Sequence, residues 1–147
     1  MTTPPLTEIP VRSAAELTRR WAAVLDPPVF SARSLWLMWL GPDGRSLPVI
    51  VPIDDLPRLP DVGLTDGLLT LHDSVVEGRL EDGHLALALC RPGSPAVTED
   101  DDEWADALRD TFDEQIDGTW SLHLAAGGLV VPLQEAPPWA FRHRPTS

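Results

Sequence analysis

The segment 84-HLALALCRPGSPAVTEDDDEW-104 decides the fold. Residues 84–90 form an apolar run of strand length, and such a run without polar alternation is typical of a strand covered on both faces. Pro and Gly then interrupt the chain at 91–97. Thr98, followed three residues later by Asp101, is typical of a capped helix start. One face of the helix carries Trp104, Leu108, Thr111 and Phe112. The segment therefore predicts a buried strand, a loop and an amphipathic helix.

The rest of the chain extends this unit on both sides. A capping box at 13–16 predicts a helix that stops at 27–28, where two prolines follow one another. Residues 35–40 and 46–53 are expected to be strands around a turn at 41–44, and about 64–76 a helix. Residues 120–125 and 129–133 are expected to form a hairpin. The order α-β-β-α-β-α-β-β predicts one α/β domain over 13–134, with helices on both faces of a mixed sheet. A flexible lead-in (1–12) and a Pro-rich tail (135–147) flank it.

Composition limits the class of protein. The chain has 147 residues, enough for one well-buried core. No run approaches the ~18 to 20 apolar residues needed to cross a membrane, and the first ten residues lack the features of a signal peptide. Cys90 is the single cysteine, so a disulfide within one chain is excluded. We expect a cytoplasmic protein with no membrane partner.

The net charge of −12 is large for this length. It argues against nucleic acid as a partner, because phosphate contacts depend on Lys and Arg. Acidic residues gather between 99 and 117, where Arg109 is the single basic residue. This segment is either a solvated helix face or a docking surface for a basic partner.

Four short motifs, in order, resemble the JAB/MPN (JAMM) metalloprotease family in its RadC-like bacterial branch, whose architecture is cytidine-deaminase-like. Leu40-Gly-Pro-Asp-Gly-Arg45 resembles the family's L-D-x-x-x-R turn, and 85–92 stands where the family has a strand ending in H-x-H-P. Thr98-Glu-Asp-Asp101 resembles its S-x-x-D helix start, and 121–124 a D-H-L strand. The resemblance runs from about residue 11 to 133 and implies a zinc hydrolase fold.

Most of the zinc site that the resemblance implies is replaced. Two histidines and an aspartate hold zinc in the family, a serine positions the reacting oxygen and a glutamate is the general base. These positions fall on Leu89 and Arg91, on Asp101, on Thr98 and on Ser34. Leucine has no donor atom, and a protonated guanidinium cannot bind a cation. We therefore expect a degenerate member with no catalytic residue, no metal and no cofactor.

Other donors do not replace those lost. Leu89 and Arg91 share one strand face, so Cys90 points to the other face and is expected to be a buried structural cysteine. His84 also lies opposite Leu89, and His72 is expected at a helix surface or half-buried. His123 matches a family position that is not a ligand.

Arg91 itself suggests a hypothesis. Its positive charge stands where the family holds its metal, near Asp101. An Arg91–Asp101 ion pair would join the strand end to the helix start in place of the metal; the alternative is that Arg91 points into solvent.

The favoured function is a noncatalytic JAB/MPN-like domain that binds protein. Trp139 and Phe141, with Arg142 and Arg144 nearby, are candidate contacts for a protein partner or a second copy of the chain, although the tail is equally consistent with docking on its own domain. One alternative is a metal-dependent peptidase or isopeptidase with a rebuilt site. The other is a role in DNA repair by family analogy, which the acidic charge opposes.

Overall fold

A computed structural model describes residues 10–77, 83–113, 115–116, 118–137 and 140. The helices in this part of the chain are α1 (Ala14–Val24), α2 (Val62–Val76) and α3 (Glu99–Phe112). The strands are β1 (Ser34–Leu40), β2 (Ser46–Asp54), β3 (His84–Cys90), β4 (Thr119–Ala126) and β5 (Leu129–Gln134). The α/β class and the element order expected from the sequence are confirmed.

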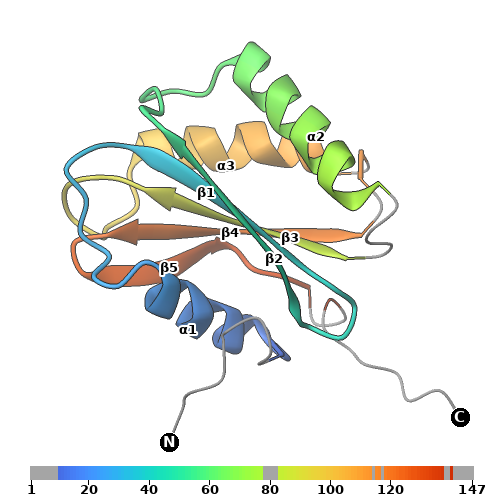
Figure 1. Ribbon diagram of the computed structural model, residues 1–147. Helices are drawn as coiled ribbons and strands as arrows, with labels where there is room; N and C mark the ends of the chain where they lie inside the picture. Colours follow the sequence, from blue (N-terminus) through green and yellow to red (C-terminus); the bar gives the residue numbers. More distant parts are fainter. Residues whose placement is uncertain (1–9, 78–82, 114, 117, 138–139, 141–147) are drawn as a thin grey trace, which may run out of the picture.

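The strands form one mixed sheet in the order β2-β1-β3-β4-β5 (Figure 1). β1 is antiparallel to both β2 and β3, and β4 is antiparallel to β5. β3 and β4 are parallel, and α3 provides the crossover that a parallel pair requires. Every residue of the central strand β3 is buried, because strands flank it on both sides and helices cover both faces.

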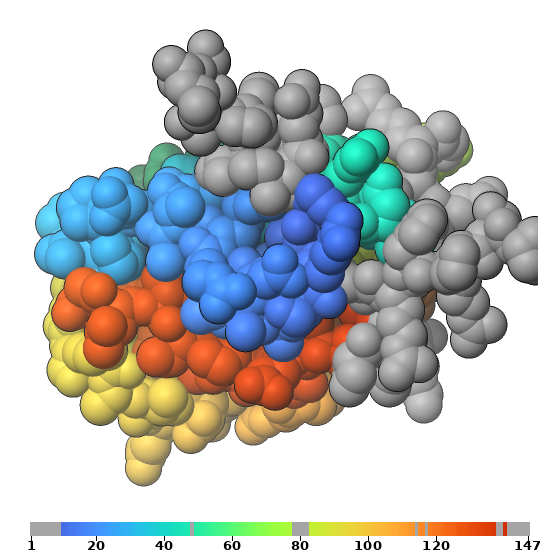
Figure 2. Space-filling view, turned by 90° about the horizontal axis from the view of Figure 1, so that it is seen from below, coloured from blue at the N-terminus to red at the C-terminus, as the bar shows by residue number. Residues whose placement is uncertain are grey.

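Alternating side chains divide the core into two halves. The half beneath α2 and α3 takes Leu35, Leu37, Trp39, Leu85, Leu87 and Leu89 from β1 and β3. The half beneath α1 takes Met38, Leu40, Ala86, Ala88 and Cys90 from the same strands. Figure 1 shows α2 and α3 on one side of the sheet and α1 on the other. Seen from the α1 side, Figure 2 shows the blue helix lying beside the orange surface that contains β5. The predicted three layers are therefore present.

Each helix begins at a side chain that accepts a backbone hydrogen bond. Ser13 Oγ accepts from Glu16 N (3.1 Å), and Thr98 Oγ1 accepts from Asp101 N (3.2 Å). Asp61 Oδ1 accepts from Gly63 N (3.4 Å), so α2 begins two residues before the expected position 64. These bonds satisfy first-turn N–H groups that have no partner within the helix.

The described parts of the lead-in and the tail are packed on the domain. Val11 is 1% exposed, and its N–H donates to Gly44 O (2.8 Å). Gly44 has φ +82°, and a Cβ there would lie 2.0 Å from Val11 O, so this approach requires glycine. Ala136 and Ala140 are buried on the α1 face. The packed part of the chain thus begins at Val11, inside the lead-in 1–12 that was expected to be flexible. Single apolar residues can fill gaps in a core without showing any periodic pattern in the sequence. Trp139 and Phe141 lie outside the described residues.

Buried polar side chains line the sheet beneath α1. His84 Nδ1 lies 2.7 Å from Thr119 Oγ1, and His84 Nε2 lies 2.7 Å from Ser121 Oγ. His123 Nε2 lies 2.8 Å from Thr18 Oγ1 of α1. Burial lowers the pKa of His84 to about 3, with a further contribution from His123, and lowers the pKa of His123 to about 4. Both imidazoles are therefore neutral at pH 7.

These two histidines predict that stability falls in mild acid. Their ordinary pKa is 6.5, so the unfolded chain takes up protons below that pH while the folded chain stays neutral until about pH 4 for His123 and about pH 3 for His84. The free energy of unfolding should fall by roughly 1.5 kcal/mol for each histidine between pH 6.5 and about pH 5. Urea unfolding at several pH values in this range measures the slope.

His123→Gln is the matched variant, because an amide can still bond to Thr18 but does not titrate. Its slope should be shallower than that of the wild type by the contribution of one histidine. Equal slopes for the two proteins would show that His123 does not carry the effect.

Candidate functional site

The end of β3 and the start of α3 are joined by an ion pair. Arg91 Nε donates to Asp101 Oδ1 and Arg91 Nη2 donates to Asp101 Oδ2, both at 2.8 Å. The Arg91 residue is 3% exposed and Asp101 0%. Two parallel bonds between a guanidinium and a carboxylate are a strong, geometrically specific contact. The predicted Arg91–Asp101 pair is confirmed, and the alternative of a solvent-facing Arg91 is wrong.

The remaining guanidinium donors hold the loop between the two elements. Arg91 Nη1 donates to Pro92 O (3.0 Å) and to Ser94 O (2.8 Å). Arg91 Nη2 also donates to Ala96 O (2.8 Å). All five N–H donors of the guanidinium are thereby used. One side chain fixes the loop at 92–96 and attaches it to the helix start.

Asp101 also closes the helix cap. Its Oδ2 accepts from Thr98 N (2.9 Å), while Thr98 Oγ1 accepts from Asp101 N, which completes a capping box. Burial alone would raise the pKa of Asp101, but the bonds from Arg91 and Thr98 together outweigh it and lower the pKa. The bond to Asp101 raises the pKa of Arg91. Both groups are therefore charged at neutral pH, and the carboxylate lies at the favourable end of the helix dipole.

These residues do not fit the zinc ion that the resemblance implies. Leu89 is 0% exposed, lies in the core beneath α2 and α3, and offers no donor atom. Both oxygens of Asp101 accept hydrogen bonds, and the neighbouring charge of Arg91 opposes a cation. Across the described residues, no group of three or more His, Cys, Asp or Glu side chains is arranged to hold a metal. The described residues therefore do not form the zinc site that the resemblance implies.

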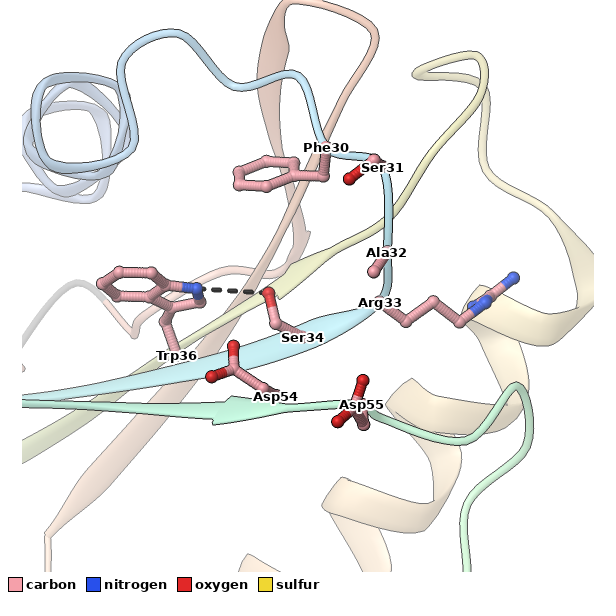
Figure 3. A pocket seen from close by; sticks show the side chains of 8 residues that line it. All are labelled: Phe30, Ser31, Ala32, Arg33, Ser34, Trp36, Asp54 and Asp55. Atoms are coloured by element: carbon pink, nitrogen blue, oxygen red, sulfur yellow. Dashed lines mark hydrogen bonds between the residues drawn. The ribbon is translucent and has the colours of Figure 1, made fainter.

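Ser34 does not lie with the other positions that the resemblance names. It pairs with Cys90 and with Asp54, which places its side chain on the α1 face, whereas Leu89 and Arg91 face α2 and α3. Arg33, one residue earlier, points toward α3, and its Nη2 lies 4.0 Å from Asp100 Oδ2 (Figure 3). Arg33 rather than Ser34 thus lies on the side of the site, and neither residue is a carboxylate base.

The remaining candidate donors are structural. Cys90 is fully buried on the α1 face, and burial raises the pKa of its thiol to about 12, so it is not a nucleophile at neutral pH. His72 is 4% exposed, more buried than expected, and its Nδ1 accepts from Trp39 Nε1 (3.1 Å). His84 and His123 lie beneath α1, on the face opposite Leu89.

Sequence reasoning missed the contacts that surround the ion pair. Asp100 lies within 3.5 Å of Arg58 Nη1 and within 4.0 Å of Arg33 Nη2. Trp104 Nε1 donates to Arg58 O (3.0 Å), which ties α3 to the loop before α2. No sequence signal identifies these partners, because their positions depend on how two loops pack against α3.

A scan of protein families, a search of curated proteins and a search of solved structures found no match to this chain. Within the described residues, no helix is long and apolar enough to cross a membrane.

The ion pair predicts a large loss of stability in Arg91→Ala. This variant leaves the Asp101 carboxylate buried without its counter-charge. It also leaves three loop carbonyls without the N–H groups that donate to them. The free energy of unfolding should fall by about 3–5 kcal/mol. Arg91→Lys should recover part of that loss, because it keeps the charge but not the planar fork. Urea unfolding measures both.

Arg109→Ala is the control. Arg109 forms an exposed pair with Asp106 at 2.7 Å, three residues apart on α3, and its Nη2 donates to Gln134 Oε1 (3.1 Å), so its removal should cost only about 1–2 kcal/mol. Equal losses in the two alanine variants would contradict the structural role assigned to Arg91.

Proposed function

We propose that this chain is a noncatalytic JAB/MPN-like domain that acts by binding protein. The element order supports that resemblance, as does the sheet with helices on both faces (Figure 1). The motif at 40–45 lies between β1 and β2, the motif at 85–92 at β3, and the motif at 98–101 at the start of α3, as the resemblance implies. The function then rests on how the site has changed, because a fold by itself does not determine an activity.

The Arg91–Asp101 pair is the observation that carries the proposal. Leu89 and Arg91 stand at the two histidine positions of the family, one an apolar side chain and the other a fixed cation, and Arg91 binds the carboxylate at the third ligand position, Asp101. A closed network in which each guanidinium N–H already has an acceptor leaves no open position for a water or a substrate oxygen. This supports a structural role for the former catalytic centre.

Exposed apolar side chains beside this centre support a contact with protein. Val29, Val97 and Leu129 are 63%, 50% and 55% exposed. Gly128 N donates to Pro28 O (3.1 Å), so the β4–β5 turn adjoins the loop that carries Val29. A Cβ on Gly127 would lie 2.6 Å from Pro95 Cδ, so the same turn adjoins the loop that carries Val97. Contiguous exposed apolar patches mark interaction surfaces, and these adjoining loops are where the proposed function places such a patch.

The alternatives have weaker support. A peptidase with a rebuilt metal site needs donors that the described residues do not bring together. A role at DNA needs a basic surface, and the net charge of −12 opposes it.

Metal analysis tests the loss of the zinc site. Purified wild-type protein given excess zinc and then dialysed should retain far less than one equivalent, and it should not cleave peptide or isopeptide substrates. Leu89→His combined with Arg91→His restores two imidazoles near Asp101 and should raise zinc retention, while Leu89→Ala combined with Arg91→Ala should not. Stoichiometric zinc in the wild type, lost in Asp101→Asn, would overturn the noncatalytic proposal. A folded double-histidine variant that retains no zinc would overturn the family correspondence.

Site-specific crosslinking tests the protein contact. A photoreactive residue placed at Val97 or Leu129 in the cells that make the protein should give a discrete crosslinked product. The same residue at Thr70, which is exposed on α2, should not. A product of twice the chain's mass would identify a second copy as the partner. The absence of a discrete product from both apolar positions would remove the support for this surface.

A further inference from the structure

A second site is suggested by a cavity on the α1 face, beside the edge strand β2. It has a volume of about 340 Å³ and is lined by Phe30, Ser31, Ala32, Arg33, Ser34, Trp36, Asp54 and Asp55. This volume lies at the small end of the range of ligand pockets, about 300–1,000 Å³, and suits a side chain or a similarly small group. Arg91 faces the opposite side of the sheet, so the cavity is separate from the centre described above.

Two aromatic rings form the apolar part of the cavity. Phe30 and Trp36 pack on the core beneath α1 and remain partly exposed. Trp36 Nε1 donates to Ser34 Oγ (3.2 Å), which restrains the ring (Figure 3). Ser34 is 7% exposed, so this support is buried. The π-face of a Trp ring attracts a cation placed within about 6 Å of it.

Two carboxylates form the polar part. Asp54 is the last residue of β2 and lies opposite Ser34, and Asp55 follows it. Among the described residues, neither carboxylate has an ion-pair partner within 4.0 Å. Arg33 also lines the cavity, but its guanidinium points away toward Asp100 (Figure 3). Neither carboxylate therefore has a described ion-pair partner, and the two aspartates with Arg33 give the lining a net charge of −1.

The geometry points to a binding site for a cationic side chain of a protein partner, arginine in preference to lysine. Its flat guanidinium can stack on Trp36 while its N–H groups bond to Asp54 and Asp55. A hard metal ion fits poorly, because it needs six or more oxygen ligands and the aromatic rings supply none. The net charge of −12 favours a basic partner at longer range as well. This inference deepens the proposed function by naming the chemistry of its partner.

The chain also has arginines of its own in the tail, Arg142 and Arg144, which lie outside the described residues. β5 begins at the end of the sheet where Ser34 lies and runs away from it, since Ala125 pairs with both Cys90 and Val130 while Gln134 pairs with Leu122. Residues 135–137 therefore follow β5 at the end of the sheet away from the cavity. An occupant from another protein is favoured for this reason.

A small probe tests the cavity without any partner protein. The full ¹⁵N-labelled chain is titrated with Nα-acetyl-arginine methylamide, and the indole N–H signal of Trp36, assigned with Trp36→Phe, is followed by NMR. We expect a saturable shift with a dissociation constant on the order of millimolar. The neutral isostere Nα-acetyl-citrulline methylamide should give no saturable shift. An equal response to both probes, or a response to neither, would overturn the inference.

Variants locate the binding. Asp54→Asn combined with Asp55→Asn should weaken arginine binding at least tenfold. Asp66→Asn combined with Asp73→Asn, the same charge change on the exposed side of α2, should leave it within a factor of two. Unchanged binding in the first variant would overturn the site. If a chain ending at residue 140 binds the probe at least tenfold more tightly than the full chain, the tail is the occupant and the partner assignment is wrong. Failure here leaves the crosslinking test of Val97 and Leu129 unaffected, so the two proposals fail separately.

Discussion

The buried guanidinium of Arg91 is the interaction on which the arrangement of β3, its loop and α3 depends. A positive charge enclosed by protein is costly unless its donors and its charge are both satisfied. Here the Asp101 carboxylate supplies the counter-charge and two acceptors, and three loop carbonyls supply the rest. The same carboxylate closes the cap of α3. Strand end, loop and helix start therefore form one electrostatic unit, in which removal of any member leaves another unsatisfied.

This unit does the structural work that a metal ion does in a metal-holding site, since it joins a strand end to a helix start through charge. It differs in what it leaves for chemistry. A catalytic zinc keeps one coordination position for water, whereas a guanidinium with five bonded donors has no position left. The surfaces that remain open are the apolar loops beside the centre and the acidic, aromatic cavity on the opposite face. Under the proposed function, both are surfaces for the recognition of another molecule.

The elements were predictable because their patterns are local and strong. The unbroken apolar run of β3, the cap at Thr98 and the glycine pair of the β4–β5 turn each specify one structure. The Arg91–Asp101 pair was predicted from the metal position of the family that the chain resembles, and the structure gives its physical reason: Arg91 lies on the helix side of the strand and Asp101 lies at the helix start. The carbonyl acceptors at 92–96 were not predictable, because every residue has a backbone carbonyl and the sequence does not show which of them will accept a hydrogen bond from Arg91. The contacts of Arg33 and Arg58 with Asp100 were not predictable either, since both arginines lie on loops that pack against α3. The burial of Val11 and Ala136 was not predictable, because no periodic pattern of apolar residues surrounds either of them.

Ser34 shows why the face on which a residue lies is hardest to predict from the sequence at the end of a strand. Side chains alternate between faces, so a displacement of one residue moves a position to the other side of the sheet. The resemblance puts Ser34 at the same centre as Leu89 and Arg91, whereas its register with Cys90 places it beneath α1. That shift has a chemical consequence. On the α3 side, the neighbouring Arg33 adds positive charge near Asp100, whereas on the α1 side the Ser34 hydroxyl supports the Trp36 ring beside Asp54 and Asp55. The start of β1 therefore separates a side where Arg33 lies near Asp100 from a side where Asp54 and Asp55 have no described ion-pair partner, and the proposed attraction for a cation concerns the second side.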